Sequence, residues 1–387
     1  MGLFSSTAWK KQLPMVPQCG QCKLDKECPH PPKQAAQGHG ARGILLIGEH
    51  PDRYAGERGS PNDTIRVQMS LAGIDMHRDC LLTWATICSP AEGPPSEAQI
   101  EFCRPSLQAI LDEFDPNIII PFGEHATRAL IGPIWDDGQG YSPFRWAGFR
   151  IPCQKPNSWV CPTFHPAIAR ESMMTGLALA KHVKRAIEIP GKPWNRNTLP
   201  DYDKEVRVVM DQTEACRLIQ SFLDGDPKNP IAVDIETDGL KPDRADALIY
   251  TCALSNGMRR DGGLTIAYPW TPMTMAATAN VIFSGRPLVA SNMKYEERWF
   301  IRFFGRGADY WHRDTMLRAH WEDCRQAITG LKFQSFVKLG QPAYNESVKN
   351  FLEADGGANA KNRIRSAPLR DVLHYNGMDA ILERMLV

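Results

Sequence analysis

The chain has 387 residues, of which 43% are hydrophobic and 23% charged, a composition typical of folded globular proteins and not of disordered ones. Its 45 basic and 44 acidic residues nearly cancel, so bulk charge does not indicate a strongly basic nucleic-acid-binding module. No apolar run reaches the ~20 residues of a membrane span, and residues 1–18 lack a signal-peptide core. We therefore expect a cytoplasmic protein, in the host cytoplasm if it is viral, with no membrane partner.

The sequence contains eleven cysteines and no export signal, which favours metal ligands or buried thiols over disulfides. Two thiols in a Cys-x-x-Cys spacing can reach one metal. A third candidate thiol follows the strand predicted for residues 81–87, and a fourth lies in a helix predicted to begin near Ser96. The four candidates are Cys19, Cys22, Cys88 and Cys103. Four thiolates suit either an iron-sulfur cluster or structural zinc, and the spacing does not decide between them. Cys28 and His30 could also serve as zinc ligands, or Cys28 could be unused.

A buried-type strand is predicted for residues 43–48, and it ends in a turn that contains Glu49 and His50. α/β sheets commonly place a site at such a strand end. Much later, His165 lies at a predicted strand-to-helix junction. The dipole of a helix N-terminus favours a neutral imidazole there, which can donate a hydrogen bond to a developing anion.

These segments resemble the family 4 iron-sulfur uracil-DNA glycosylases. The matching pieces are Cys19-x-x-Cys22, the Gly48-Glu49-x-Pro51 turn, Cys88 with Cys103, residues 118–130 and residues 162–167. The resemblance implies a three-layer α/β/α domain, which we assign to residues 1–188. It also implies a structural [4Fe-4S] cluster bound by Cys19, Cys22, Cys88 and Cys103.

The resemblance further implies a pocket for a base that is flipped out of the DNA, stacked on an aromatic ring and read by an Asn. His165 would stabilise the departing base. However, Trp84 stands where the family has its reading Asn, and within residues 52–62 only Tyr54 could replace the stacking ring. Phe164 is a further candidate for contact with nucleic acid.

Three interpretations of this domain remain open. It could excise a different base, with Trp84 reshaping the pocket and Glu49 or His50 activating water. It could bind DNA, or a polymerase, without any chemistry. It could also retain weak uracil excision, although an indole cannot replace a buried polar reader without loss of discrimination.

A linker is predicted for residues 189–204, where Pro, Gly and Asn are frequent and no periodicity is present. The second domain, residues 205–387, begins with an edge-type strand at residues 206–210. Its central segment is residues 231–240, where alternation places Asp234 and Glu236 on the face opposite the large aliphatic side chains. Two adjacent carboxylates need a cation, and hard divalent ions such as Mg²⁺ or Mn²⁺ suit them.

Two later segments carry side chains that could complete such a site. A short strand at residues 287–290 is followed by Asn292 and Glu296, four residues apart. Near the end of the printed sequence, Tyr375 and Asp379 share one helical face at i, i+4 spacing.

In this order, the three segments resemble the Tyr-containing DEDD-type 3′-to-5′ proofreading exonuclease of family A DNA polymerases. The resemblance implies a ribonuclease H-like fold in which Asp234, Glu236 and Asp379 bind two Mg²⁺ or Mn²⁺ ions. Tyr375 would orient the attacking water. Glu296 stands where the family usually has Asp, and the extra methylene could slow a reaction that depends on precise positions.

We therefore expect a two-domain α/β protein of DNA replication or repair: a metal-dependent 3′-to-5′ exonuclease joined to a glycosylase-like module. Its substrate would be a single-stranded or frayed 3′ end contacted by Asn292. The fusion resembles the N-terminal part of phage-type DNA polymerases, and we expect the polymerase to be a separate partner chain. The alternatives are a non-enzymatic polymerase accessory subunit and a bifunctional uracil-DNA glycosylase and exonuclease.

Overall fold

The computed structural model describes residues 16–29, 31–51, 60–195, 199–354, 356 and 360–387. The chain divides into two units. Unit 1 contains residues 1–199 and 336–343, and unit 2 contains residues 200–335 and 344–387. None of the helices in the described residues is both long enough and apolar enough to cross a membrane.

Unit 1 is built on a five-stranded sheet with the order β2-β1-β3-β5-β4. The strands are β1 (Ile44–Gly48), β2 (Cys80–Trp84), β3 (Ile118–Pro121), β4 (Ile151–Cys153) and β5 (Ser158–Val160). β1 is parallel to β2 and β3, β3 is parallel to β5, and β4 alone is antiparallel to its neighbour. The carboxyl ends of β1, β2 and β3 therefore meet at one edge of the sheet, where side chains from all three can form a pocket.

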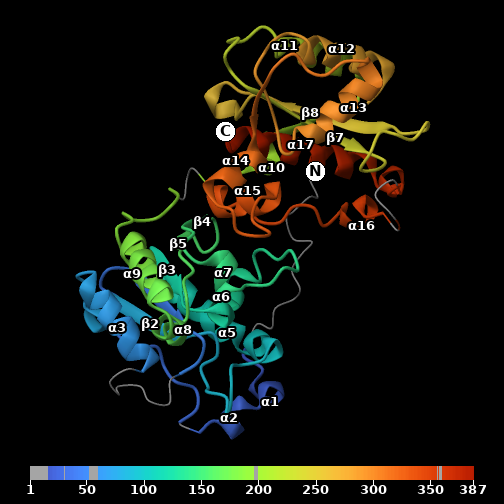
Figure 1. Ribbon diagram of the computed structural model, residues 1–387. Helices are drawn as coiled ribbons and strands as arrows, with labels where there is room; N and C mark the ends of the chain where they lie inside the picture. Colours follow the sequence, from blue (N-terminus) through green and yellow to red (C-terminus); the bar gives the residue numbers. More distant parts are fainter. Residues whose placement is uncertain (1–15, 30, 52–59, 196–198, 355, 357–359) are drawn as a thin grey trace. The chain divides into compact units, whose positions relative to one another are not determined.

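Helices cover both faces of this sheet. They are α1 (Cys19–Cys22), α2 (Leu24–Glu27), α3 (Pro61–Leu71), α4 (Met76–Asp79), α5 (Glu97–Phe114), α6 (Glu124–Ile131), α7 (Pro143–Trp146), α8 (Pro166–Glu171) and α9 (Met173–Ile187). Apolar residues of α3 and α9 pack with Ile44, Leu46 and Ile120 of the sheet. Figure 1 shows α5 and α6 on the other side of the strands. Burial on both faces explains why these strands read as continuous apolar runs.

Unit 2 contains a six-stranded sheet with the order β11-β10-β7-β8-β9-β6. The strands are β6 (Val206–Val208), β7 (Ile231–Thr237), β8 (Ile249–Ser255), β9 (Thr265–Pro269), β10 (Leu288–Ala290) and β11 (Trp311–Asp314). β7, β8 and β9 are antiparallel neighbours, whereas β10 and β11 run parallel to β7 on its other side, and β6 pairs with β9. This mixed order around a central β7 is ribonuclease H-like.

The helices of this part of the chain are α10 (Tyr202–Glu205), α11 (Gln212–Ser221), α12 (Pro272–Ile282), α13 (Lys294–Phe304), α14 (Thr315–Glu322), α15 (Leu331–Leu339), α16 (Lys349–Leu352) and α17 (Leu369–Met385), with 3₁₀ turns at Arg259–Asp261 and Ile364–Ser366. Apolar residues of α11, α12 and α13 pack on one face of the sheet. α17 contacts β6, β7, β8, β9 and β10 (Figure 1). A Cβ on Gly377 would lie 2.3 Å from Cγ1 of Val206, so a glycine is needed for α17 to lie this close to the sheet.

Candidate functional site

Three carboxylates of unit 2 converge between its central strand and α17. Asp234 and Glu236 lie on β7 and Asp379 lies on α17, and one oxygen of each is within 4.8 Å of the other two. Val233 and Ile235, which alternate with the acids, are buried in the core on the opposite face. The two-residue period of the strand thus delivers both carboxylates to the helix that carries the third.

The environment of these carboxylates disfavours their charge. Burial raises the pKa of both Asp234 and Glu236, and the neighbouring carboxylates raise it further. Glu296, which is 2% exposed, has a raised pKa for the same two reasons, with Asp234 as the main neighbour. A divalent cation offsets such repulsion, so this set of carboxylate oxygens, from the half-buried Asp234 and Glu236 and the buried Asp379, fits Mg²⁺ or Mn²⁺.

Asn376, which the sequence analysis did not identify, fixes the position of Asp234. Its side-chain amide nitrogen donates a hydrogen bond to the Asp234 carboxylate, and its amide oxygen accepts one from the Thr251 hydroxyl at 2.8 Å. Asn376 is fully buried. The i, i+4 spacing of Tyr375 and Asp379 gave no indication of this contact, because Asn376 is not one of the two residues that the spacing relates.

Lys332 and Tyr344 were also missed, and both contact the predicted site residues. Lys332 Nζ donates to the Tyr375 hydroxyl at 2.6 Å and lies 3.6 Å from Asp379 Oδ2. The Tyr344 hydroxyl donates to Asp379 Oδ1. Burial, followed by the nearby Asp379 carboxylate, raises the pKa of both tyrosines, so both hydroxyls remain protonated at neutral pH.

Glu296 lies beside this group but outside its compact centre. Within the described residues, the group of ligand oxygens that all lie within 4.8 Å of one another consists of one each from Asp234, Glu236 and Asp379, and it does not include an oxygen of Glu296. Glu296 Oε2 is buried and has no hydrogen-bond partner among the described residues. Glu383, one turn beyond Asp379 and 1% exposed, accepts the Ser291 N–H at 2.9 Å. Burial, followed by the charges of Asp234 and Glu296, raises the pKa of Glu383, and no sequence motif pointed to this residue.

The segment that carries Asn292 is held by Asp314. This carboxylate caps α14 by accepting the Met316 and Leu317 N–H groups, and it also accepts the N–H groups of Asn292 and Met293, each at 3.0 Å. Asn292 has φ +68°, in the left-handed region that Asn tolerates better than most residues. The clamp therefore fixes the backbone between β10 and α13, where Asn292 lies, just before the first turn of α13, which carries Glu296.

In unit 1, the four predicted thiols line a single pocket. Cys19, Cys22, Cys88 and Cys103 reach it from α1, from the segment after β2 and from α5, and its other lining residues are largely apolar. Backbone N–H groups point at two of the sulfurs, from Lys33 to Cys88 at 3.2 Å and from Ile87 to Cys103 at 3.4 Å. Burial raises the pKa of Cys103 to about 11 and also raises that of Cys22 and Cys88.

Either an iron-sulfur cluster or a zinc ion would stabilise thiolates that burial otherwise disfavours. Within the described residues no three of these sulfurs lie within 4.8 Å of one another, a wider spacing than a single zinc ion with Zn–S bonds of about 2.3 Å requires. N–H donors to the sulfurs are also a feature of iron-sulfur sites. Cys28 accepts the Ser89 N–H at 3.3 Å. The other residue considered for zinc, His30, lies outside the described residues.

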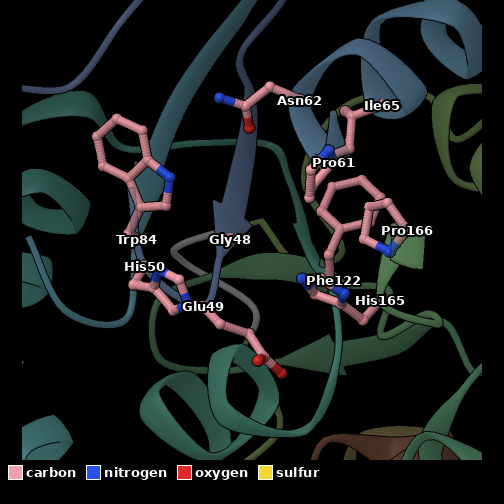
Figure 2. A pocket seen from close by; sticks show the side chains of 10 residues that line it. All are labelled: Gly48, Glu49, His50, Pro61, Asn62, Ile65, Trp84, Phe122, His165 and Pro166. Carbon is pink, nitrogen blue, oxygen red and sulfur yellow. The ribbon is translucent and has the colours of Figure 1, made fainter. Parts of the chain in front are cut away.

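A second pocket lies at the carboxyl edge of the unit 1 sheet (Figure 2). Its lining comes from the ends of β1 and β2, from the residue after β3 and from the first residues of α3 and α8. The lining residues are Gly48, Glu49, His50, Pro61, Asn62, Ile65, Trp84, Phe122, His165 and Pro166. The predicted Glu49, His50, Trp84 and His165 are therefore brought together, whereas Asn62 and Phe122 were not predicted.

The two histidines of this pocket are oriented by backbone groups. His165 is the N-cap of α8, as the sequence predicted, and its Nδ1 accepts the Ala167 N–H at 3.2 Å. The ring proton must then lie on Nε2, which is the neutral donor form. His50 Nδ1 lies 3.0 Å from the Pro51 carbonyl, which can only accept, so the neutral His50 ring has its acceptor at Nε2.

The remaining predicted contacts of unit 1 lie elsewhere. Tyr54 is outside the described residues. Phe164 is 8% exposed and packs against the rings of Phe144 and His182, at centroid distances of 5.5 and 6.0 Å, and is not among the residues that line the pocket. Phe164 faces the interior because the alternation of the chain at this junction directs His165 to the pocket.

Glu49 forms an ion pair with His125, which the sequence analysis did not single out. His125 Nδ1 lies 3.0 Å from Glu49 Oε1, although the ring is not aligned for a hydrogen bond. Burial works against the charge of Glu49, but the side-chain contact with His125 and the charges of His125 and His165 outweigh it and lower its pKa. The contact with Glu49 raises the pKa of His125, against the effect of burial.

This pair predicts a pH-dependent contribution to stability. Because the folded pKa of His125 is raised, the pair stabilises the fold while His125 is protonated, and the contribution is lost as the pH rises through that pKa. The lowered pKa of Glu49 keeps its carboxylate ionised across this range. We expect His125→Gln to lower the heat-unfolding midpoint by about 2 °C near pH 6 and by much less near pH 8. Calorimetry of the full chain would refute this if the two shifts were equal.

Comparisons with known proteins found relatives of unit 1 in sequence. Residues 37–187 match the family model for the Uracil DNA glycosylase superfamily. Two relatives named type-4 uracil-DNA glycosylase come from Sulfurisphaera tokodaii and Saccharolobus solfataricus. They are 25% and 28% identical over 160 and 163 residues, which cover 40% of this chain in each case and 72% and 73% of the relatives.

Similar solved structures include NrnC from Brucella melitensis bound to pGG, the catalytic core of RRP6 from Trypanosoma brucei and the EXD2 exonuclease domain soaked in Mg and GMP. Their identities are 15%, 15% and 13%, and the TM-scores are 0.32, 0.31 and 0.23. The matches cover 42%, 50% and 45% of this chain and 72%, 53% and 87% of those chains.

The resemblance of unit 1 to the glycosylases is confirmed by the family match, and the fold predicted for unit 2 is confirmed by its strand order. The chain is therefore an α/β protein with two mixed sheets, in which a uracil DNA glycosylase-like domain precedes a ribonuclease H-like domain.

Proposed function

We propose that unit 2 is a metal-dependent 3′-to-5′ exonuclease that hydrolyses the terminal phosphodiester of a single-stranded or frayed DNA end. The observation that carries this proposal is the convergence of Asp234, Glu236 and Asp379, with one oxygen of each within 4.8 Å of the other two. The Tyr375 hydroxyl lies in the same cluster because Lys332 contacts both Tyr375 and Asp379. Clustered carboxylates beside a neutral phenol suit hydrolysis by a positioned water.

The three acids would hold two Mg²⁺ or Mn²⁺ ions, which when bound would supply Lewis-acid stabilisation and a reactive water. Asn376 holds Asp234 in place, and Tyr344 and Lys332 hold Asp379. The protonated Tyr375 hydroxyl can orient the water by accepting or donating a hydrogen bond. Asn292 would contact the nucleic acid from the segment clamped by Asp314.

The test is the polarity and metal dependence of strand shortening. A 5′-labelled single strand of DNA incubated with Mg²⁺ should shorten stepwise from its 3′ end, and EDTA should stop the reaction. An RNA strand of the same sequence serves as the comparison substrate. Retained DNA affinity without shortening would instead support a non-enzymatic accessory protein, and internal cuts would contradict an exonuclease.

Lys332→Met should lower the turnover of this reaction by about 10²-fold with little change in DNA affinity. The reason is that Lys332 Nζ contacts both Tyr375 and Asp379, and a displacement of about 1 Å in a catalytic group costs rates of this order. Lys361→Met removes an exposed lysine that pairs with Asp246, and it should leave turnover unchanged. If both variants reduced turnover equally, Lys332 would have no special role in positioning these groups.

We further propose that unit 1 engages DNA and carries a structural [4Fe-4S] cluster on Cys19, Cys22, Cys88 and Cys103. When bound, the cluster would cross-link α1, the segment after β2 and α5. Support comes from the shared pocket of the four thiols, the N–H donors to their sulfurs and the similarity to type-4 uracil-DNA glycosylases. A DNA polymerase chain is the partner that a proofreading-type nuclease would serve.

Base excision by unit 1 is the second candidate activity, favoured by the pocket that contains His165 in its donor form. A duplex with one uracil, incubated in EDTA and then treated with alkali, tests it. A break at the uracil would make the protein bifunctional. An intact strand would leave binding of DNA or a polymerase, or action on another base, as the role of unit 1.

A further inference from the structure

The helix that supplies Asp379 to the acidic cluster carries a further buried carboxylate. Tyr375, Asp379 and Glu383 follow one another at intervals of four residues on α17, so they lie on one face of the helix. Glu383 is 1% exposed, and no lysine or arginine forms an ion pair with it among the described residues. Burial of a carboxylate without such a partner costs free energy, which indicates that the contact it makes matters.

That contact is with the segment between β10 and α13. Glu383 Oε1 accepts the Ser291 N–H at 2.9 Å, and its Oε2 is buried without a hydrogen-bond partner among the described residues. Asp314 accepts the next two N–H groups, those of Asn292 and Met293. Three successive backbone N–H groups are therefore bound by two carboxylates, one from α17 and one from the end of β11.

The first turn of α13 depends on these contacts for its position. Its N-terminus has no hydrogen bond from a capping side chain, so the preceding N–H contacts fix where the helix begins. Glu296 lies in this first turn, and its Oε2 is buried with no hydrogen-bond partner among the described residues. The place of Glu296 beside the acidic cluster thus follows from the backbone that carries it.

We infer that Glu383 is a positioning residue of the proposed nuclease. By accepting the Ser291 N–H, it ties the segment with Asn292 and Glu296 to the helix that carries Asp379. Asp314 holds the same segment from β11, but it gives no link to α17. The inference rests on the proposed exonuclease activity, since a reaction that depends on positions to within about 1 Å is sensitive to this link.

The test compares two substitutions of Glu383 in the full chain. Glu383→Leu removes the acceptor, and its single-turnover rate with Mg²⁺ at saturating DNA should fall by about 10²-fold. Glu383→Gln still accepts through its amide oxygen, so its rate should stay within about threefold of the wild type. Glu353→Leu, which removes an exposed carboxylate elsewhere in unit 2, should retain the full rate. A role in stability alone would lower the unfolding midpoint without lowering rates measured well below it.

Hydrogen exchange of the backbone amides, measured without DNA or metal, reports on the link itself. Exchange at Ser291 should become about tenfold faster in Glu383→Leu, because a buried hydrogen bond is lost, and it should stay slow in Glu383→Gln. An unchanged rate or unchanged exchange in Glu383→Leu, or equal rate losses in both variants, would overturn the inference. Failure of the nuclease proposal would appear separately, as a wild type that does not shorten DNA.

Discussion

Asp234→Asn is expected to lower the rate of Mg²⁺-dependent strand shortening by about 10³-fold, because a lost metal ligand removes several kcal/mol of transition-state stabilisation. The substitution keeps the shape of the side chain and removes the charge that Glu236 and Asp379 would share with it in holding metal. The rate should be measured under single-turnover conditions, so that product release does not hide the effect.

The matched control is Asp224→Asn, which changes an exposed aspartate elsewhere in unit 2. This variant should retain the full rate. DNA affinity in EDTA should be the same for both variants, because no metal is present to distinguish them. A rate for Asp234→Asn within tenfold of the wild type would place the reaction somewhere other than this acidic cluster.

The double substitution Cys88→Ser with Cys103→Ser should remove the visible absorbance of the purified protein and lower the unfolding midpoint of unit 1 by about 10 °C or more. The reason is that a cluster would tie α1 to two segments far along the chain, and the variant loses two of four ligands. Absorbance and calorimetry on the same sample measure both effects.

Cys216→Ser is the control, since this half-buried cysteine belongs to unit 2. It should change neither the colour nor the unfolding of unit 1. A colourless wild-type protein with bound zinc would replace the cluster by a zinc site on the same thiols. Colour retained in the double variant would show that these cysteines are not the ligands.

The acidic cluster was predictable from sequence to the extent that local periodicity determines it. Strand alternation placed Asp234 and Glu236 on one face, and helical spacing placed Tyr375 and Asp379 together. Lys332 and Tyr344 lie in segments whose own pattern says nothing about Asp379, and only the packing of the chain brings them to it. The role of Asn376 depends on how closely α17 packs on the sheet, and the close approach of Gly377 to Val206 and Ala267 of β6 and β9 is part of that packing.

The pocket at the carboxyl edge of the unit 1 sheet was likewise predictable only where the local sequence pattern determines it. The turn after residue 48 and the helix start at His165 have recognisable local chemistry, and both were identified. Asn62 was not, because residues 52–62 were considered only as a source of a stacking ring, and nothing local indicates that the start of α3 faces the end of β1. For Glu296, the motif gave the correct neighbourhood, but the short strand and helix around it could not give the distances to the other carboxylates.

The most direct test of the metal site is the number of Mn²⁺ ions that each chain binds, counted by electron paramagnetic resonance in the absence of DNA. If Asp234, Glu236 and Asp379 hold the metal, the wild type should bind Mn²⁺. The Asp379→Asn variant, which lacks the ligand carried by α17, should lose this binding. Equal Mn²⁺ binding by the two proteins would contradict the assignment of Asp234, Glu236 and Asp379 as the centre of the nuclease.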